Sequence, residues 1–305
     1  YLDNIHNEKS HPNENYAREL LELHTLGVDG GYSQQDVQEV ARILTGWTVA
    51  RRGRQRGHFL FDDAQHDFGE KWVMGHHFPA GRGPEEVAEL LNFLAAHPAT
   101  ASFLAAKLVR RFVADEPPAD LVAQVADAYV QSDGEIKPML RQLFLSDAFA
   151  TAPAKLKRPY TFMVSALRAL HTDLRLGRGR AVGDWLQQMG QMPFHWPPPD
   201  GYPDTSAAWA ANLLPRWNFA LALLHNNVPG ATVPLEEILV AGGAAAVDDA
   251  VQLFAGLIYG RSLHSNELAL FTDYAGGSPL QHNETLTRLR DCAALMLASA
   301  EFQWM

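Results

Sequence analysis

Apolar residues recur every three to four positions along most of this chain, a spacing that places them on one face of an α-helix. Residues 13–26 are typical: Leu20 and Leu23 share a face, Asn13 suits the N-cap, and Gly27 suits the end. The same periodicity predicts helices over 33–44, 85–96, 99–113, 121–131, 136–145, 160–170, 212–225, 246–259 and 285–299. The sequence therefore predicts a mainly α, multi-helical globular fold.

The pattern changes after Gly46. Three short β-prone runs, 47–49, 58–61 and 72–74, lie around an arginine- and glycine-rich loop. We expect them to form a small antiparallel β ribbon inserted among the helices, over about residues 47–75.

A chain of 305 residues fits either one large domain or two fused subdomains. The two-part interpretation gives a helical subdomain with the β insert over residues 1–150. A second helical subdomain with a proline- and tryptophan-rich loop (190–210) then covers residues 151–305. A single continuous domain stays open as the alternative.

The formal net charge is −10, from 35 acidic and 25 basic residues, and it disfavours binding to nucleic acids or anionic lipid surfaces. Four arginines form the one obvious basic run: Arg51, Arg52, Arg54 and Arg56. No stretch of about 18 apolar residues predicts a membrane span. Cys292, the only cysteine, has no disulfide partner within the chain and suits a buried position.

The densest polar cluster lies on the first predicted helix. Glu14, Arg18 and Glu22 follow one another at intervals of four, and Glu19 shares that side. Two interpretations of this cluster are open. It can be a solvated salt-bridge ladder, or a carboxylate face that holds a metal or a catalytic water. His24 points toward the apolar side, where a histidine is usually a hydrogen-bonded core residue.

The turn after this helix copies the second half of a calcium-binding EF-hand loop. Asp29 and Asp36, with Glu39, predict a partial site for a divalent cation, most plausibly calcium. Thr25 and Gly27 stand where the first half of such a loop needs charged oxygen ligands. A helix–turn–helix in which the acidic residues act as caps is the alternative.

A third candidate is the loop beside the β insert, where His66 precedes Asp67. This pair can serve as a general base with an orienting carboxylate, or as two metal ligands. Lys71 and the pair at 76–77 lie close by in the sequence. Polar loop residues without a catalytic role are the alternative.

Aromatic and acidic residues provide the predicted substrate-binding surface. Within 190–210, indole and phenol rings flanked by aspartates suit a platform for a small molecule or a glycan, and equally suit packing of the loop onto the helices. The residues assigned to this surface are Trp47, Trp196, Asp200, Tyr202 and Trp209. The motifs of serine hydrolases, HExxH zinc enzymes and P-loop nucleotide enzymes are missing from the sequence.

The long motif at residues 13–32 resembles the signature of the bacterial family called domain of unknown function 1800 (DUF1800). The resemblance continues through Trp47, His66, Asp67 and the run Pro197-Pro-Pro-Asp-Gly-Tyr202. It suggests the C-terminal two-thirds of a member, with a segment missing upstream. The resemblance implies an exported, periplasmic or secreted location, although the chain itself starts without a signal peptide. It implies no reaction.

Two functional hypotheses follow. In the first, the protein is a metal-assisted hydrolase of a small ester or lactone, in which calcium activates a water and His66, Asp67, Glu22 and His24 provide the acid–base groups. In the second, it is a non-catalytic exported binding or assembly module with a structural cation site. Its oligomeric state is not indicated by the sequence.

Overall fold

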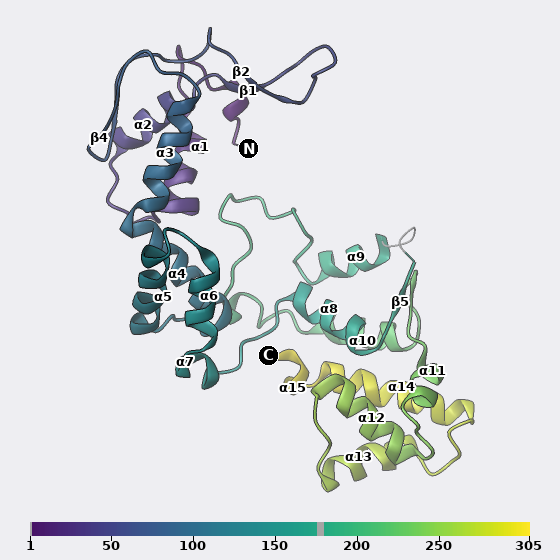
Figure 1. Cartoon of the computed structure of the whole chain (residues 1–305). Helices are drawn as coiled ribbons and strands as arrows, with labels where there is room; N and C mark the ends of the chain where they lie inside the picture. Colours follow the sequence, from purple (N-terminus) through teal and green to yellow (C-terminus); the bar gives the residue numbers. More distant parts are fainter. Residues whose placement is uncertain (1, 176–179) are drawn as a thin grey trace. The chain divides into compact units, whose positions relative to one another are not determined.

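Short helices build most of the chain, as the periodicity predicts. In the computed structural model, which describes residues 2–175 and 180–305, Asn13 caps the first α-helix and Ser33 forms a capping box with Asp36 at the second. The mainly α fold class is confirmed. The chain divides into two units, Tyr1–Ala152 and Pro153–Met305 (Figure 1).

The first unit consists of helices with four short strands among them. Its helices are η1 (Asn4–His6), α1 (Glu14–Glu19), the π-helix η2 (Leu20–Thr25), α2 (Gln34–Ile43), α3 (Glu85–Ala96), α4 (Pro98–Phe112), α5 (Ala119–Gln131), α6 (Ile136–Phe144) and α7 (Asp147–Ala150). Its strands are β1 (Trp47–Val49), β2 (Phe59–Phe61), β3 (Lys71–Val73) and β4 (His76–Phe78).

Two apolar clusters form the core of this unit. One joins η2, α2 and α3 through residues such as Leu21, Val40 and Leu90, all fully buried. The other joins α4, α5 and α6 through residues such as Val109 and Met139. Figure 1 shows α4, α5 and α6 side by side.

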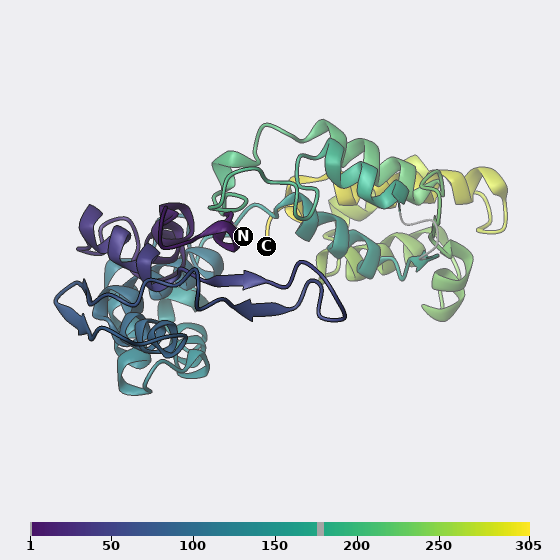
Figure 2. The same ribbon diagram turned by 90° about the horizontal axis from the view of Figure 1, so that it is seen from above.

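The predicted β insert consists of two separate antiparallel ribbons. Trp47 of β1 pairs with Phe61 of β2, and the loop between these strands extends away from the helices of the unit (Figure 2). In the second ribbon, β3 pairs with β4, a strand that the sequence did not predict. Met74 and Gly75 connect them, both with positive φ, which is the backbone of a two-residue hairpin turn.

The second unit is helical with one two-residue ribbon. Its helices are α8 (Pro159–Ala169), α9 (Arg180–Gln188), η4 (Ser206–Ala208), α10 (Leu214–Leu224), α11 (Leu235–Ala241), α12 (Val247–Tyr259), α13 (Ser265–Ala275), α14 (Asn283–Ala298) and α15 (Ala300–Gln303). Its strands are β5 (Asp173–Leu174) and β6 (Ala231–Thr232). The sequence did not predict α9, α11, α13 or α15, which are short or largely exposed. No described helix of either unit has both the length and the apolar character that crossing a membrane requires.

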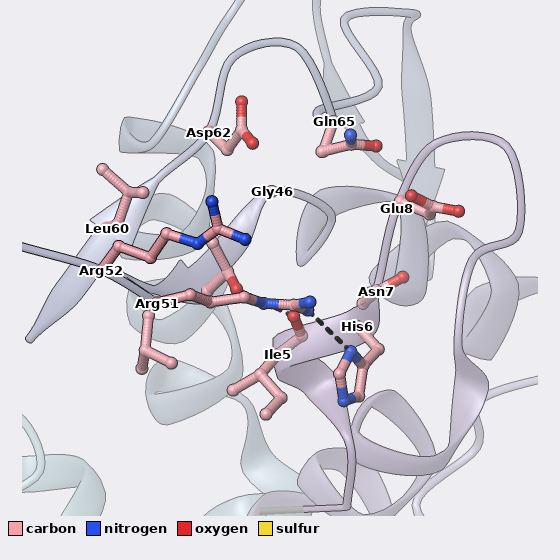
Figure 3. A pocket seen from close by; sticks show the side chains of 12 residues that line it. Ile5, His6, Asn7, Glu8, Gly46, Arg51, Arg52, Leu60, Asp62 and Gln65 are labelled. Carbon is pink, nitrogen blue, oxygen red and sulfur yellow. Dashed lines mark hydrogen bonds between the residues drawn. The ribbon is translucent and has the colours of Figure 1, made fainter. Parts of the chain in front are cut away.

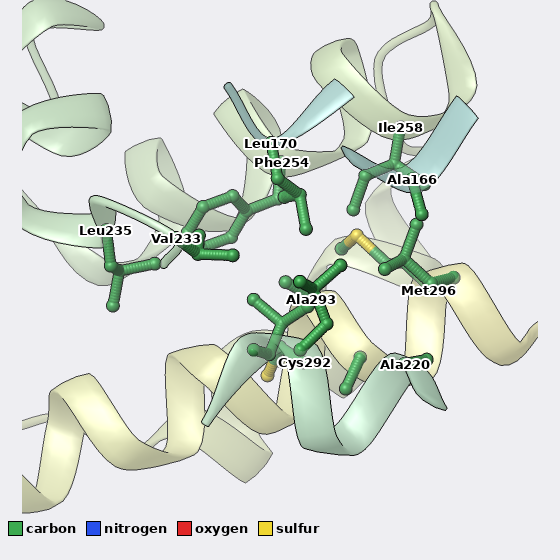
Figure 4. Close-up of a cluster of buried hydrophobic side chains, with 14 of the residues drawn as sticks. Ala166, Leu170, Ala220, Val233, Leu235, Phe254, Ile258, Cys292, Ala293 and Met296 are labelled. Atoms are coloured by element: carbon green, nitrogen blue, oxygen red, sulfur yellow. The ribbon is translucent and has the colours of Figure 1, made fainter. Parts of the chain in front are cut away.

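Small side chains let α14 approach its neighbours closely in the second core. Cys292, Ala293 and Ala220 meet there, and Phe254 fills the space beside them (Figure 4). The Cys292 thiol is buried, as predicted, and that burial raises its pKa to about 12. A thiol in this state packs as a small apolar group.

Gly46, where the chain leaves α2 for β1, provides a test of this fold. Its φ is 78°, and a Cβ there would lie 2.7 Å from the Asp62 carbonyl oxygen. Gly53 has a similar φ of 76° but open space around it. We expect Gly46→Ala to lower the free energy of unfolding by about 1–3 kcal/mol more than Gly53→Ala, measured by urea denaturation. Equal losses of unfolding free energy in the two variants would contradict the close approach of Gly46 to the Asp62 carbonyl.

Candidate functional site

The helix that carries the long motif changes its winding part-way along. Asn13 begins α1, and from Leu20 the chain continues as the π-helix η2. At its end, the amides of Leu26 and Gly27 both donate to the Leu21 carbonyl, at 2.8 and 3.1 Å. Such π turns are rare overall, and those that occur are often found at functional sites.

The acidic ladder on this helix connects it to α2. Glu14 pairs with Arg18 at 3.1 Å, and the Gln34 amide donates to Glu14 at 2.7 Å and accepts from Arg18 at 2.8 Å. Further along, Glu22 lies near Tyr32, whose pKa is raised mainly by burial and further by the Glu22 carboxylate. The first part of the ladder is thus a structural ion pair.

His24 is exposed rather than directed into the core. The expectation that it lies on the apolar side was therefore wrong, because the π-helix rotates this last turn relative to a regular α-helix. Its catalytic role, like that of Glu22, stays a prediction.

The three predicted cation ligands have different surroundings. Asp29 is exposed. Asp36 accepts hydrogen bonds from Ser33 and, at 2.6 Å, from the Met74 amide. Burial alone would raise the Asp36 pKa, but these donors lower it below its ordinary value. Glu39 binds Arg42 at 2.7 Å. The ion pair of Glu39 lies within α2, but the same carboxylate also accepts from the Trp72 amide at 3.4 Å. Asp36 and Glu39 therefore both connect α2 to the second ribbon.

His66 lies at the centre of a fully buried polar network. Its Nδ1 donates to the Thr45 carbonyl at 2.8 Å, and its Nε2 lies 3.6 Å from Glu86 Oε2. The Lys71 ammonium pairs with the same carboxylate oxygen at 2.8 Å. Lys71 also donates to the carbonyls of Asp67 and Gly69, so that all three of its protons are used. The side chains of His66, Lys71 and Glu86 are completely inaccessible to solvent.

Opposing effects act on the pKa of His66. Burial lowers the His66 pKa, but the Glu86 carboxylate and the Thr45 carbonyl outweigh it, and the net pKa is raised above 6.5. His66 Nε2 and Glu86 Oε1 have no hydrogen-bond partner among the described residues. Glu86 lies in the first turn of α3, where a helix stabilises negative charge.

Asp67 binds different partners from those of His66. Arg42 binds both of its carboxylate oxygens, at 2.7 and 3.3 Å, and the Gly69 amide donates to it at 2.8 Å. Arg42 lowers the Asp67 pKa, so this carboxylate stays ionised. His66 and Asp67 do not form the predicted acid–base pair: one belongs to the core and the other to an arginine on α2.

A pocket of about 590 Å³ lies beside this network. Figure 3 shows the guanidinium groups of Arg51 and Arg52 directed into the space that Glu8, Asp62 and Gln65 border. Backbone contacts build its walls: the Gly46 amide donates to the Asn7 carbonyl, the Asp62 amide to the Gly46 carbonyl, and the Lys9 amide to the Gln65 carbonyl.

The two arginines of the pocket differ in their contacts. Arg51 donates to His6 Nδ1 at 3.0 Å, which places the proton of a neutral His6 ring on Nε2. Arg52 forms no hydrogen bond or ion pair with any residue that the structure describes. The pocket thus offers an available cation on one side and two carboxylates on the other.

The aromatic residues of the 190–210 loop mainly contact other residues of the same loop. The Trp196 indole donates to Asp200 at 3.0 Å, the Tyr202 hydroxyl donates to the Met192 carbonyl at 2.7 Å, and Trp209 is buried. The Trp196 and Tyr202 rings lie 5.0 Å apart. These contacts fit packing within the loop, and Trp196 keeps partial exposure.

Trp47 belongs to the first unit and contacts Phe59 across the first ribbon, at 4.9 Å between ring centroids. It does not line the pocket, although its neighbour Thr48 does. Its role in substrate binding stays a prediction.

Several residues of this site were not predicted from the sequence. Glu86, Arg42 and Thr45 looked like ordinary helical or loop residues, and His6 and Glu8 precede the first predicted helix. The charged Lys71, directly before the β-prone run 72–74, was the one signal that a buried counterion exists. Over residues 2–175 and 180–305, no group of three or more His, Cys, Asp or Glu side chains is placed to hold a metal.

A family model described as "Protein of unknown function (DUF1800)" matches residues 1–304. The chain belongs to the DUF1800 family. The match covers essentially the whole chain, so for this DUF1800 protein the motif at 13–32 is one part of a resemblance that extends through both units. No curated protein and no solved structure matches it.

The buried ion pair predicts a large effect of a small substitution. Glu86→Gln keeps the shape but leaves the Lys71 ammonium without a counterion, and we expect the free energy of unfolding to fall by about 3–5 kcal/mol in urea denaturation. Glu70→Gln, on an exposed side chain that faces His77, is the matched control and should change it little. Similar effects of both variants would show that the pair does not stabilise the fold.

The raised His66 pKa predicts a pH dependence. A group with a raised folded-state pKa contributes its full stabilisation below the unfolded-state value of 6.5 and loses it as the pH rises through the folded-state value. We therefore expect the difference in unfolding free energy between the wild type and His66→Gln to be larger at about pH 6 than at about pH 8. A difference that is constant or grows with pH would contradict the contact with Glu86.

Proposed function

We propose that this DUF1800 protein is a non-catalytic ligand-binding module whose first unit binds a polar, anionic small molecule in the pocket beside β1 and β2. The observation that carries the proposal is the Arg52 guanidinium, which borders the pocket without a partner among the described residues. Guanidinium groups bind carboxylates and phosphates through paired, charge-assisted hydrogen bonds.

The opposite side of the pocket narrows the class of ligand. Glu8, Asp62 and Gln65 present hydrogen-bond acceptors there, and Leu60 adds an apolar contact. A sugar acid has the matching groups, since its carboxylate suits Arg52 and its hydroxyls can donate to the carboxylates. The volume of about 590 Å³ accommodates a ligand of this size.

The hydrolase hypothesis has less geometric support. His66 is enclosed, Asp36 accepts from a backbone amide, and Glu39 pairs with an arginine. Ester or lactone hydrolysis and calcium binding stay predictions, tested by metal content and by turnover before and after chelation. The exported location also stays a prediction from the family resemblance.

Arg52 provides the test. Glucuronate, as the probe sugar acid, should bind the wild type in a calorimetric titration more tightly than glucose does. Arg52→Ala should weaken glucuronate binding by about tenfold or more, the loss expected for a charge-assisted hydrogen bond. Arg56→Ala is the matched control, because this exposed arginine lies on the same loop but does not line the pocket.

Two outcomes would contradict the proposal. Equal binding of glucuronate and glucose would remove the role of the anionic group. An equal loss in Arg52→Ala and Arg56→Ala would show a diffuse attraction to the basic loop in place of a site.

A further inference from the structure

A pocket of about 460 Å³ lies within the second unit. It forms where the end of α8, the strand β5 and the helices α11 and α12 meet (Figure 1). Its floor is apolar, because Ile238 of α11 and Leu253 and Leu257 of α12 line it. A pocket of this volume accommodates a small organic molecule.

The charged side chains that line this pocket are carboxylates. Asp173 of β5 and Glu237 of α11 both border it and are exposed. Neither carboxylate forms a hydrogen bond or an ion pair with any residue that the structure describes. No lysine or arginine is found among the described residues that line the pocket. We call Asp173 and Glu237 the acidic rim, and its two negative charges lie beside an apolar floor.

Two helix C-termini add partial negative charge at the same place. At the end of α8, the Thr172 amide donates to the Leu167 carbonyl at 3.0 Å, and His171 takes a left-handed φ of 46°. At the end of α11, the Ala244 amide donates to the Leu239 carbonyl, also at 3.0 Å. The carbonyl groups of a last helical turn carry partial negative charge, so both ends favour a cation.

The basic residues that usually compensate a helix C-terminus are not part of the described pocket wall. α11 has no basic residue in its last turn, and Arg168, in the last turn of α8, does not line the pocket. His171 does line it, and a neutral imidazole can accept a hydrogen bond from a cationic donor. The rim, the helix ends and this ring therefore all favour a ligand of positive charge.

One close contact holds the acidic rim against the apolar floor. Gly242 follows the last residue of α11, and a Cβ there would lie 2.3 Å from Leu253 Cδ2. The end of α11 thus rests directly on the leucine that lines the floor. A ligand in this pocket meets apolar and anionic groups together.

We propose that this pocket binds a small aliphatic amine, whose ammonium group lies at the acidic rim while its hydrocarbon chain covers Leu253 and Leu257. An ammonium group has three donors and no acceptor, which suits a rim of carboxylates and a neutral imidazole. The site is independent of the pocket in the first unit, which presents a guanidinium group and suits an anion.

The test is a calorimetric titration of the full chain with hexylammonium, hexanol and methylammonium. We expect hexylammonium to bind at least about tenfold more tightly than either of the others, because it alone has both the charge and the chain. Equal binding of hexanol would reduce the site to an apolar pocket, and equal binding of methylammonium would reduce it to an acidic patch. Either result would overturn the proposal, as would no binding of hexylammonium.

Neutral variants of the acidic rim test the role of its charge. The double variant Asp173→Asn with Glu237→Gln should weaken hexylammonium binding by about tenfold or more and leave hexanol binding unchanged. Both side chains are exposed, so the thermal midpoint of the free protein should stay the same. Glu236→Gln is the matched control for Glu237→Gln, because it removes the same charge from the same helix at a residue outside the pocket. Equal losses in these two single variants would overturn the proposal.

A steric variant tests the location of the site without changing its charge. Ala241 is exposed and lines the pocket, so the ring in Ala241→Phe should block hexylammonium and leave the fold intact. Unchanged hexylammonium binding in Ala241→Phe would place the amine elsewhere and overturn the assignment.

Discussion

The ion pair between Lys71 and Glu86 is the interaction on which the first unit depends. Both groups are removed from water, which costs several kcal/mol per ion unless the two charges meet directly. They meet at 2.8 Å, and the remaining Lys71 protons bind the carbonyls of Asp67 and Gly69. One ammonium group therefore fixes the first turn of α3, the strand β3 and the loop that precedes it.

That loop also forms one wall of the pocket beside β1 and β2. Asp62 and Gln65 lie a few residues before His66, and His66 is anchored to Thr45 and Glu86. The polar core thus sets the position of the acceptors that face Arg52. In the second unit, the buried Arg216 donates to a backbone carbonyl and to the Gln303 side chain and lies near the Phe162 ring, and it forms no ion pair with a described carboxylate.

Features that depend on neighbouring residues could be predicted from the sequence. Helical periodicity, the cap at Asn13 and the capping residue Ser33 follow from local chemistry, and so does the buried Cys292. The pairing of Lys71 with Glu86 and the grouping of Arg52 with Glu8 depend on chain segments that meet only after folding. The strand β4 was missed because Met74 occupies a positive-φ turn position that asparagine or glycine usually takes. His66 was recognised as important, but a sequence pattern cannot distinguish a buried imidazole from a catalytic one.

Hydrogen–deuterium exchange, compared between the wild type and Glu86→Gln under conditions where both are folded, tests this account most directly. The account predicts faster exchange in the 62–71 loop, at amides such as those of His66, Asp67 and Gly69, and unchanged exchange in the second unit. Such a result would show that the buried ion pair orders the pocket wall. Exchange that stays unchanged in the loop, or that rises equally throughout both units, would contradict it.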